Sequence, residues 1–178
     1  MGASRRELRA LRGFVFDLDG CVWTGDVLVS GAAEVLAMLR EQGRRVSFLT
    51  NNSGARSAGL RAQLERVGGQ AAKDEGVTPL EILSEVIASR WGLTRVLAIG
   101  GDDLGGALLE GGHELLPTDR YREAQVVVVG RDAGFSYDRL TAAARAIAGG
   151  AHFITPNLDP RLPLQGGDFL PRCGAVVE

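Results

Sequence analysis

Two aspartates near the N-terminus have the side chains and the spacing of a metal- and phosphate-binding site. Asp17 and Asp19 follow the apolar run Phe14–Phe16 at the end of a predicted strand, Gly13–Asp19. Because alternate residues of a strand face the same side, both carboxylates leave the chain in one direction. Gly20 comes next and lets the backbone turn sharply. The sequence therefore predicts a pair of carboxylates at one strand end.

A second polar cluster, Thr50-Asn51-Asn52-Ser53, closes the strand predicted at Arg45–Thr50. Asp17 and Thr50 lie 33 positions apart, which suits one β-α-β crossover. Ligands of open α/β sheets bind at the carboxyl ends of the strands, where these clusters would offer carboxylates, a hydroxyl and free amides to a divalent cation and a phosphate. Either cluster alone would equally suit a turn or a helix cap. Their occurrence together favours a functional site.

Three competing motifs fail by position. A calcium-binding EF-hand loop that starts at Asp17 needs an acidic residue at its twelfth position, which is Leu28. A phosphate-binding P-loop needs Gly-Lys-Ser/Thr, yet Ala72 precedes the only lysine, Lys73. The stretch 100–102 reads Gly-Gly-Asp and lacks the G-x-G of a dinucleotide site. An unrelated nucleotide-binding module is therefore disfavoured.

Composition limits the remaining classes of protein. The chain has 178 residues, of which 45% are hydrophobic and 24% charged, with a net charge of −2. This length fits one medium domain or two small ones. The scattered basic residues argue against nucleic acid or a membrane as partner, and no apolar run predicts a membrane span or a signal peptide. Two separated cysteines, Cys21 and Cys173, predict neither a disulfide scaffold nor structural zinc. We expect a cytoplasmic protein.

Alternating strands and helices predict an α/β fold with parallel sheets covered on both faces. The first part has two strands and two helices, the earlier helix being capped by Ser30 and ending near Gly43. Thr78-Pro79-Leu80-Glu81 then has the pattern of a capped helix start. A second series follows, with strands at Val96–Ile99, Val126–Val129 and His152–Thr155, and helices near Leu104–Glu110 and Tyr137–Ala148. The sequence thus predicts two α/β domains, 1–78 and 79–178.

These residues resemble the haloacid dehalogenase superfamily. Its first two motifs are similar to Phe14-Val-Phe-Asp-Leu-Asp-Gly20 with Trp23-x-Gly25, and to Phe48-Leu-Thr-Asn-Asn-Ser53. The resemblance is closest to the p-nitrophenyl-phosphatase and phosphoglycolate-phosphatase branch, which inserts a large α/β cap domain into a Rossmann-like core. Segments similar to that cap are Val128-Val-Gly-Arg-Asp132, Phe135-Ser-Tyr-Asp138, Gly149-Gly-Ala-His-Phe-Ile154, Asn157-Leu-Asp159 and Cys173-Gly-Ala175.

The resemblance implies a role for each site residue. Asp17 would be the nucleophile that accepts the phosphoryl group, and Asp19 would protonate the leaving alcohol and later activate water. Mg²⁺ would be held by Asp17 and the main-chain carbonyl of Asp19. The Thr50 hydroxyl and the Asn51 N–H would hold phosphate oxygens, while Asn52 would support the loop. The substrate would be a small phosphorylated metabolite chosen by the cap.

The departures from the family are equally informative. The resemblance implies a lysine in a third motif after the cap and acidic metal ligands in a fourth, and the sequence has neither; Lys73 precedes the cap. We therefore expect the N-terminal part of a phosphatase, with only the first strands of the core. Such a chain would turn over slowly, or would bind a phosphorylated ligand or a partner chain without turnover. The strand at Phe14–Phe16 would become an exposed edge, which makes a homo-oligomer possible.

Two further features have open interpretations. Trp23 lies in a stretch that corresponds to a flap beside the family's site, where it would either shield the site from water or pack beneath a loop. Arg131 and Asp132 follow a predicted strand of the cap. They would either contact substrate or lie in a solvated loop.

Overall fold

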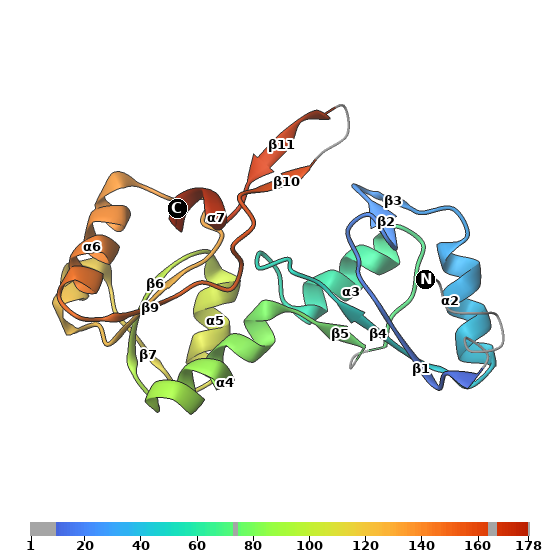
Figure 1. Cartoon of the computed structure of the whole chain (residues 1–178), viewed down its shortest axis with the longest axis horizontal. Coiled ribbons are helices and arrows are strands. Elements are labelled where there is room, and N and C mark those ends of the chain that lie inside the picture. The colour runs from blue at the N-terminus through green and yellow to red at the C-terminus, as the bar shows by residue number, and fades with distance from the viewer. Residues whose placement is uncertain (1–9, 73–74, 164–166, 178) are drawn as a thin grey trace. The chain divides into compact units, whose positions relative to one another are not determined.

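The architecture comprises two compact units, seen in a computed structural model that describes residues 10–72, 75–163 and 167–177 (Figure 1). The first unit is formed by Met1–Thr50 and Ser57–Val77, and the second by Asn51–Arg56 and Thr78–Glu178, as far as these residues are described. The domain boundary predicted at residue 78 stays a prediction, because compactness does not test independent folding. Lys73 lies outside the described residues. No described helix is long and apolar enough to cross a membrane.

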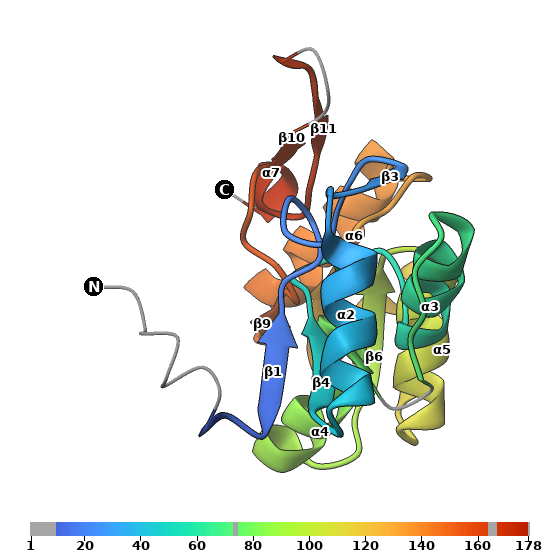
Figure 2. The same ribbon diagram turned by 90° about the vertical axis from the view of Figure 1, so that its right-hand side faces the viewer.

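A small parallel sheet organises the first unit. Its strands are β1 (Gly13–Phe16), β4 (Arg45–Leu49) and β5 (Gly76–Val77), in the order β1-β4-β5. The crossovers contain α2 (Ala32–Glu41) and α3 (Ser57–Arg66), which stand beside the strands in Figure 2. This part therefore has the parallel α/β organisation that the sequence predicted.

One face of this sheet is covered and the other is exposed. Alternation along the strands puts Phe16 and Phe48 on one face, where their rings lie 6.5 Å apart between centroids. Phe16 shares a hollow with α2, and Phe48 shares one with α3. Val15 and Leu49 point the other way and are 68% and 55% exposed. The sequence analysis expected helices on both faces of each parallel sheet, and for this sheet, as far as it is described, that expectation is wrong.

Two sequence expectations about this unit are wrong in detail. The first strand ends at Phe16 instead of Asp19, because the N–H of Leu18 donates to the Asp17 side chain and the chain turns. Ser30 does not cap the following helix. Its N-cap is Gly31, which has a φ of 83° and provides no side-chain hydrogen bond. A left-handed backbone at that position favours glycine, which has no Cβ to clash.

A short hairpin follows the first strand. It pairs β2 (Trp23–Thr24) with β3 (Val27–Leu28) in antiparallel register. The two-residue turn begins at Gly25, whose φ of 61° suits the tight turns that join hairpin strands.

The second unit is a three-layer α/β structure. Its parallel strands are β6 (Arg95–Ile99), β7 (Glu114–Leu115), β8 (Val126–Val129) and β9 (His152–Ile154), in the order β7-β6-β8-β9. One face packs on α4 (Pro79–Trp91) and α5 (Asp102–Glu110). The other packs on α6 (Tyr137–Ala148) and the 3-10 helix η1 (Thr118–Glu123). All residues of β8 are buried, as expected for a central strand.

Local sequence signals and a hairpin complete this unit. Thr78 and Glu81 form the capping box that the sequence predicted at the start of α4. The chain then passes through β10 (Arg161–Pro163) and β11 (Phe169–Pro171), which pair antiparallel, to a final short helix, α7 (Gly174–Val177).

Candidate active site

In the first unit, two neighbouring strand ends carry polar candidate residues. Parallel pairing sets Phe16 of β1 beside Phe48 of β4, so both chains leave the sheet at the same edge. Asp17 is the first residue after β1, and Thr50 is the first residue after β4. Thr50 is buried, and its N–H donates to the carbonyl of Val77. A carboxylate and a hydroxyl therefore follow adjacent strands at one sheet edge.

The turn after β1 gives the two carboxylates different surroundings. Leu18 is buried, whereas Asp17 is exposed and Asp19 is half-buried, so the alternation of the strand continues past its last paired residue. The N–H of Leu18 donates to Oδ1 of Asp17 over 2.8 Å. The Leu18 carbonyl in turn accepts from the N–H groups of Cys21, Val22 and Trp23. A buried side chain and its carbonyl thus fix the backbone between the two aspartates.

The buried Trp23 positions Asp19 through a hydrogen bond. The indole Nε1–H donates to Oδ1 of Asp19 over 3.0 Å, and Trp23 is only 1% exposed. Its ring lies near Leu18, Phe48 and Leu60 in the core. Trp23 therefore packs beneath the turn, the second of its two sequence interpretations, and it also positions a candidate catalytic carboxylate. The sequence analysis missed this hydrogen bond.

The candidate phosphate-binding asparagines belong to the second unit. Nδ2 of Asn157 donates to the carbonyl of Asn51 over 2.8 Å. Nη1 of Arg172 donates to Oδ1 of Asn51 over 3.1 Å, and Nδ2 of Asn51 donates to the carboxylate of Asp159. These partners lie more than a hundred residues along the chain. They fix the peptide carbonyl and the side chain of Asn51.

The rest of the loop 51–56 is equally well anchored. Oδ1 of Asn52 accepts from the N–H of Gly54 over 2.9 Å, which closes a local turn. Ser53 is buried with its Oγ 3.2 Å from Sγ of Cys173. Arg56 forms a two-pronged ion pair with Glu110 of α5, with both N–O distances 2.6 Å. The loop is therefore preorganised by its own unit.

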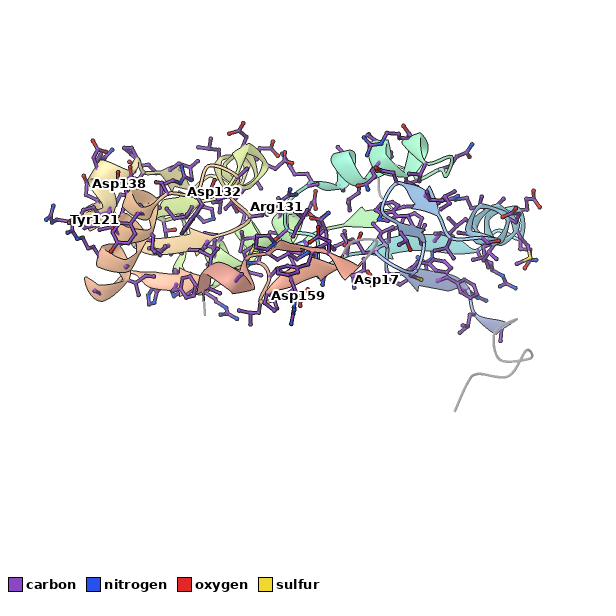
Figure 3. All side chains as sticks on the ribbon, turned by 90° about the horizontal axis from the view of Figure 1, so that it is seen from above. Asp17, Tyr121, Arg131, Asp132, Asp138 and Asp159 are labelled. Carbon is purple, nitrogen blue, oxygen red and sulfur yellow. The ribbon has the colours of Figure 1, made fainter. Side chains whose placement is uncertain are left out.

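The two residues after β8 differ in environment. Asp132 is an internal ion-pair partner, because its Oδ2 lies 2.8 Å from Nε of Arg139 and its side chain is 6% exposed. Its Oδ1 accepts from the N–H of Gly134. Arg131 is exposed. Asp132 thus has a supporting role, whereas Arg131 is an exposed residue; both are labelled in Figure 3.

The oxygens near Asp17 suit a hard divalent cation. Mg²⁺ prefers oxygen ligands and usually keeps several waters, so it is bound through one or two carboxylates together with substrate phosphate. The exposed carboxylate of Asp17 and the main-chain carbonyl of Asp19 are donors of this kind. Within the described ranges no group of three or more His, Cys, Asp or Glu residues could hold a metal ion. The carboxylate of Asp17 and the carbonyl of Asp19 therefore suit a magnesium ion that keeps several waters.

Comparison with known proteins identifies the family. A model described as haloacid dehalogenase-like hydrolase matches residues 14–114, which is more than half of the chain. The chain belongs to the haloacid dehalogenase-like hydrolase family. The matched range includes the five candidate site residues of this chain: Asp17, Asp19, Thr50, Asn51 and Asn52.

The relatives of this haloacid dehalogenase-like chain are named as phosphatases. It is 32% identical over 171 residues to an acid sugar phosphatase of Staphylococcus saprophyticus, covering 96% of this chain and 64% of the relative. It is 31% identical over 193 residues to a human glycerol-3-phosphate phosphatase, covering 92% of this chain and 59% of the relative. The chain thus spans about three-fifths of the length of these relatives.

A solved structure shows a similar fold. The glycerol phosphate phosphatase of Mycobacterium tuberculosis in complex with magnesium has a TM-score of 0.83 and 30% identity to this chain. The similarity covers 93% of this chain and 49% of that one. The same phosphatase has also been solved in complex with calcium. The α/β fold inferred from the sequence is therefore confirmed, and the metal bound by that protein is a divalent cation.

Proposed function

We propose that this chain carries the nucleophile and phosphate-binding residues of a Mg²⁺-dependent phosphomonoester hydrolase that acts through an aspartyl-phosphate. The main support is the parallel register of β1 and β4, which brings the strand ends of Asp17 and Thr50 to one sheet edge. Membership of a hydrolase family and relatives named as phosphatases add to it.

The first half-reaction transfers the phosphoryl group to the protein. A carboxylate oxygen of Asp17 forms a bond to phosphorus while the ester P–O bond breaks. The exposed position of Asp17 leaves it open to substrate, and the N–H of Leu18 fixes its Oδ1. The Thr50 hydroxyl and the Asn51 N–H donate to the phosphate oxygens.

Asp19, which accepts a hydrogen bond from Trp23, transfers protons as general acid and then as general base. A protonated Asp19 gives its proton to the departing alkoxide, so that a neutral alcohol leaves. The resulting carboxylate then takes a proton from water, whose oxygen attacks phosphorus and breaks the bond to Asp17, releasing inorganic phosphate. The hydrogen bond from the indole of Trp23 fixes one oxygen of Asp19, so the other oxygen is oriented for proton transfer.

Mg²⁺ would be held by the Asp17 carboxylate and the carbonyl of Asp19. Its charge would offset the repulsion between a carboxylate nucleophile and a phosphate dianion. We propose a small phosphorylated metabolite as substrate, such as a sugar phosphate or glycerol phosphate, because the relatives are named for these compounds.

A second candidate function is binding of a phosphorylated ligand or a partner chain without turnover. It is favoured by one observation: the described residues provide no cluster of three metal-binding side chains, whereas catalysis needs firmly held positive charge beside the phosphate.

The test is an assay of the chain with 4-nitrophenyl phosphate and Mg²⁺, together with calorimetric binding of a non-hydrolysable phosphonate. The phosphatase proposal expects Mg²⁺-dependent turnover that Asp17→Asn abolishes, since an amide is a very poor nucleophile. Thr24→Ser, at an exposed position in the hairpin, is the control. Turnover within tenfold of the wild type in Asp17→Asn would reject the nucleophile. Phosphonate binding without any turnover would select the second candidate.

A further inference from the structure

A hollow in the second unit lies where three of its parallel strands, β6, β8 and β9, begin. It measures about 690 Å³ when the space open to solvent is included. The last residue of α4, the residues before β6 and β8, the turn after α6 and the first residue of β9 all line it: Trp91, Thr94, Gln125, Gly149, Gly150 and His152. Arg131 and Asp132 follow the other end of β8, so the hollow lies at the opposite edge of this sheet.

Two stacked rings form one wall of the hollow. The indole of Trp91 and the imidazole of His152 have centroids 4.7 Å apart and planes inclined by 14°. Trp91 is half-buried and His152 is exposed, so the pair is anchored in α4 at one side and reaches solvent at the other. A nearly parallel pair of this kind presents a flat aromatic surface, on which a further flat ring can stack.

Gln125 provides fixed hydrogen-bond donors beside that wall. Its main-chain N–H donates to the carbonyl of Arg95, and its carbonyl accepts from the N–H of His152, both over 2.9 Å. Its Oε1 accepts from the N–H of Arg95 over 3.0 Å. Because a main-chain N–H can only donate, this contact decides which side-chain atom is the oxygen. No described residue accepts from Nε2 of Gln125, so both of its N–H groups are available to a ligand.

The rest of the lining is small or uncharged. Gly149 and Gly150 add no side chain, and a Cβ on Gly150 would meet no atom within 4 Å. None of the described residues that line the hollow is Asp, Glu, Lys or Arg. The neighbouring Arg95 is paired with Glu123, with an N–O distance of 3.6 Å. A charged ligand would find no counter-ion here, so the hollow favours an uncharged one.

We propose that this hollow binds an uncharged heteroaromatic ring that carries an amide carbonyl. The ring stacks with the pair Trp91 and His152, and the carbonyl oxygen accepts from Nε2 of Gln125. Every residue of the site belongs to the second unit. Neither the hollow nor its ligand depends on the proposed phosphatase function, and no test of it needs turnover.

The first test uses the unmodified chain and nicotinamide as the probe. The chain has two tryptophans, Trp23 and Trp91, so two indole N–H signals can be followed by NMR, and the one that remains in Trp23→Phe belongs to Trp91. Nicotinamide should shift the Trp91 signal saturably and leave the Trp23 signal in place. Cyclohexanecarboxamide has the same amide on a ring that is not flat, and it should shift neither. An unmoved Trp91 signal, or equal shifts with both amides, would overturn the proposal.

The second test examines the stacking. His152→Ala should weaken nicotinamide binding about tenfold, as expected when a base loses an aromatic partner. His152→Phe keeps a flat ring and should bind within about threefold of the wild type. Tyr137 is 82% exposed and does not line the hollow, so Tyr137→Ala is the control and should change nothing. Unaltered binding in His152→Ala, or equal losses in His152→Ala and Tyr137→Ala, would refute the stacked site.

The third test examines the hydrogen bond. Gln125→Glu keeps an oxygen to accept from the N–H of Arg95 but has no N–H to donate to a ligand. It should weaken nicotinamide about fivefold, as expected for one lost hydrogen bond. Binding of 3-methylpyridine, which has the ring but no carbonyl, should stay within about twofold. Equal effects on the two ligands would show that Gln125 does not bind the carbonyl and would reject the assigned ligand class.

Discussion

Replacing Trp23 with phenylalanine should destabilise the first unit and leave the second unchanged. Trp23 is 1% exposed and donates a hydrogen bond to the Asp19 carboxylate. Loss of a hydrogen bond to a charged group costs about 1.5–3 kcal/mol. The smaller ring leaves unfilled space among Leu18, Phe48 and Leu60, which adds roughly 1 kcal/mol. The expected loss in the free energy of unfolding is therefore about 3 kcal/mol.

The two tryptophans allow the units to be followed separately. The chain has two, Trp23 in the first unit and Trp91 in α4 of the second. In Trp23→Phe the sole remaining tryptophan is Trp91, so urea unfolding followed by tryptophan fluorescence reports the second unit and far-ultraviolet circular dichroism reports both. With a urea dependence of about 2 kcal/mol per molar, the dichroism transition of the first unit should move down by about 1.5 M. The Trp91 midpoint should stay in place.

A double-mutant cycle isolates the hydrogen bond from the packing. Asp19→Asn, Trp23→Phe and the double variant should give a coupling energy of about 1–2 kcal/mol if the indole positions the carboxylate. A coupling energy near zero would show that Trp23 acts by packing alone. A shift of the Trp91 midpoint as large as the dichroism shift would refute the separation into two cores.

Three further outcomes are expected. Gly106→Ala should stabilise the second unit by about 0.5–1 kcal/mol, because it removes a glycine from the interior of α5. Gly111→Ala should destabilise the same unit by about 1–3 kcal/mol, because its Cβ would overlap a side chain of α4. Urea unfolding followed by the fluorescence of Trp91 measures both changes. The hydrogen bond and charge of Arg56 hold the pKa of Glu110 below its ordinary value of 4.5. The stabilisation from this ion pair is therefore present above pH 4.5 and is lost as pH falls through the lower folded-state pKa of Glu110. In an acid titration of the free energy of unfolding, Glu110→Gln should lack this pH-dependent contribution, and high salt should reduce it in the wild type. Val15→Lys should reduce self-association of the chain, because it puts a charge on the exposed face of an edge strand; an unchanged mass in sedimentation would contradict this.

Local patterns predicted most elements of the fold. The β-rich runs of the second unit and the capping box at Thr78 involve neighbours in sequence, and the structure confirms them. Element ends were less predictable. The strand that was expected to reach Asp19 stops at Phe16 because a side-chain oxygen takes the N–H of Leu18. The strand order and the exposed face of the first sheet depend on long-range pairing, for which a single sequence carries no signal.

In the candidate site too, some features could be predicted from the sequence and others could not. Asp17 and Thr50 follow apolar strands, so their proximity could be inferred from the parallel order alone. The anchoring of Asn51 by Asn157 and Asp159 joins residues 106 and 108 positions apart, and no periodicity reveals it. The hydrogen bond between Trp23 and Asp19 spans only four positions, so an indole next to a candidate acid was the signal to follow. The catalytic roles, the self-association and the cytoplasmic location stay predictions.

The unequal cover of the two sheets bears on how well the proposed catalytic residues are positioned. The sheet of the second unit packs helices on both faces, and β8 is buried throughout. The sheet of the first unit exposes Val15 and Leu49, and β1 is its edge strand. Asp17 follows that edge strand, and catalysis depends on groups held in fixed geometry. A cover over Val15 and Leu49 would therefore stabilise the strand end that carries the proposed nucleophile as well as the fold.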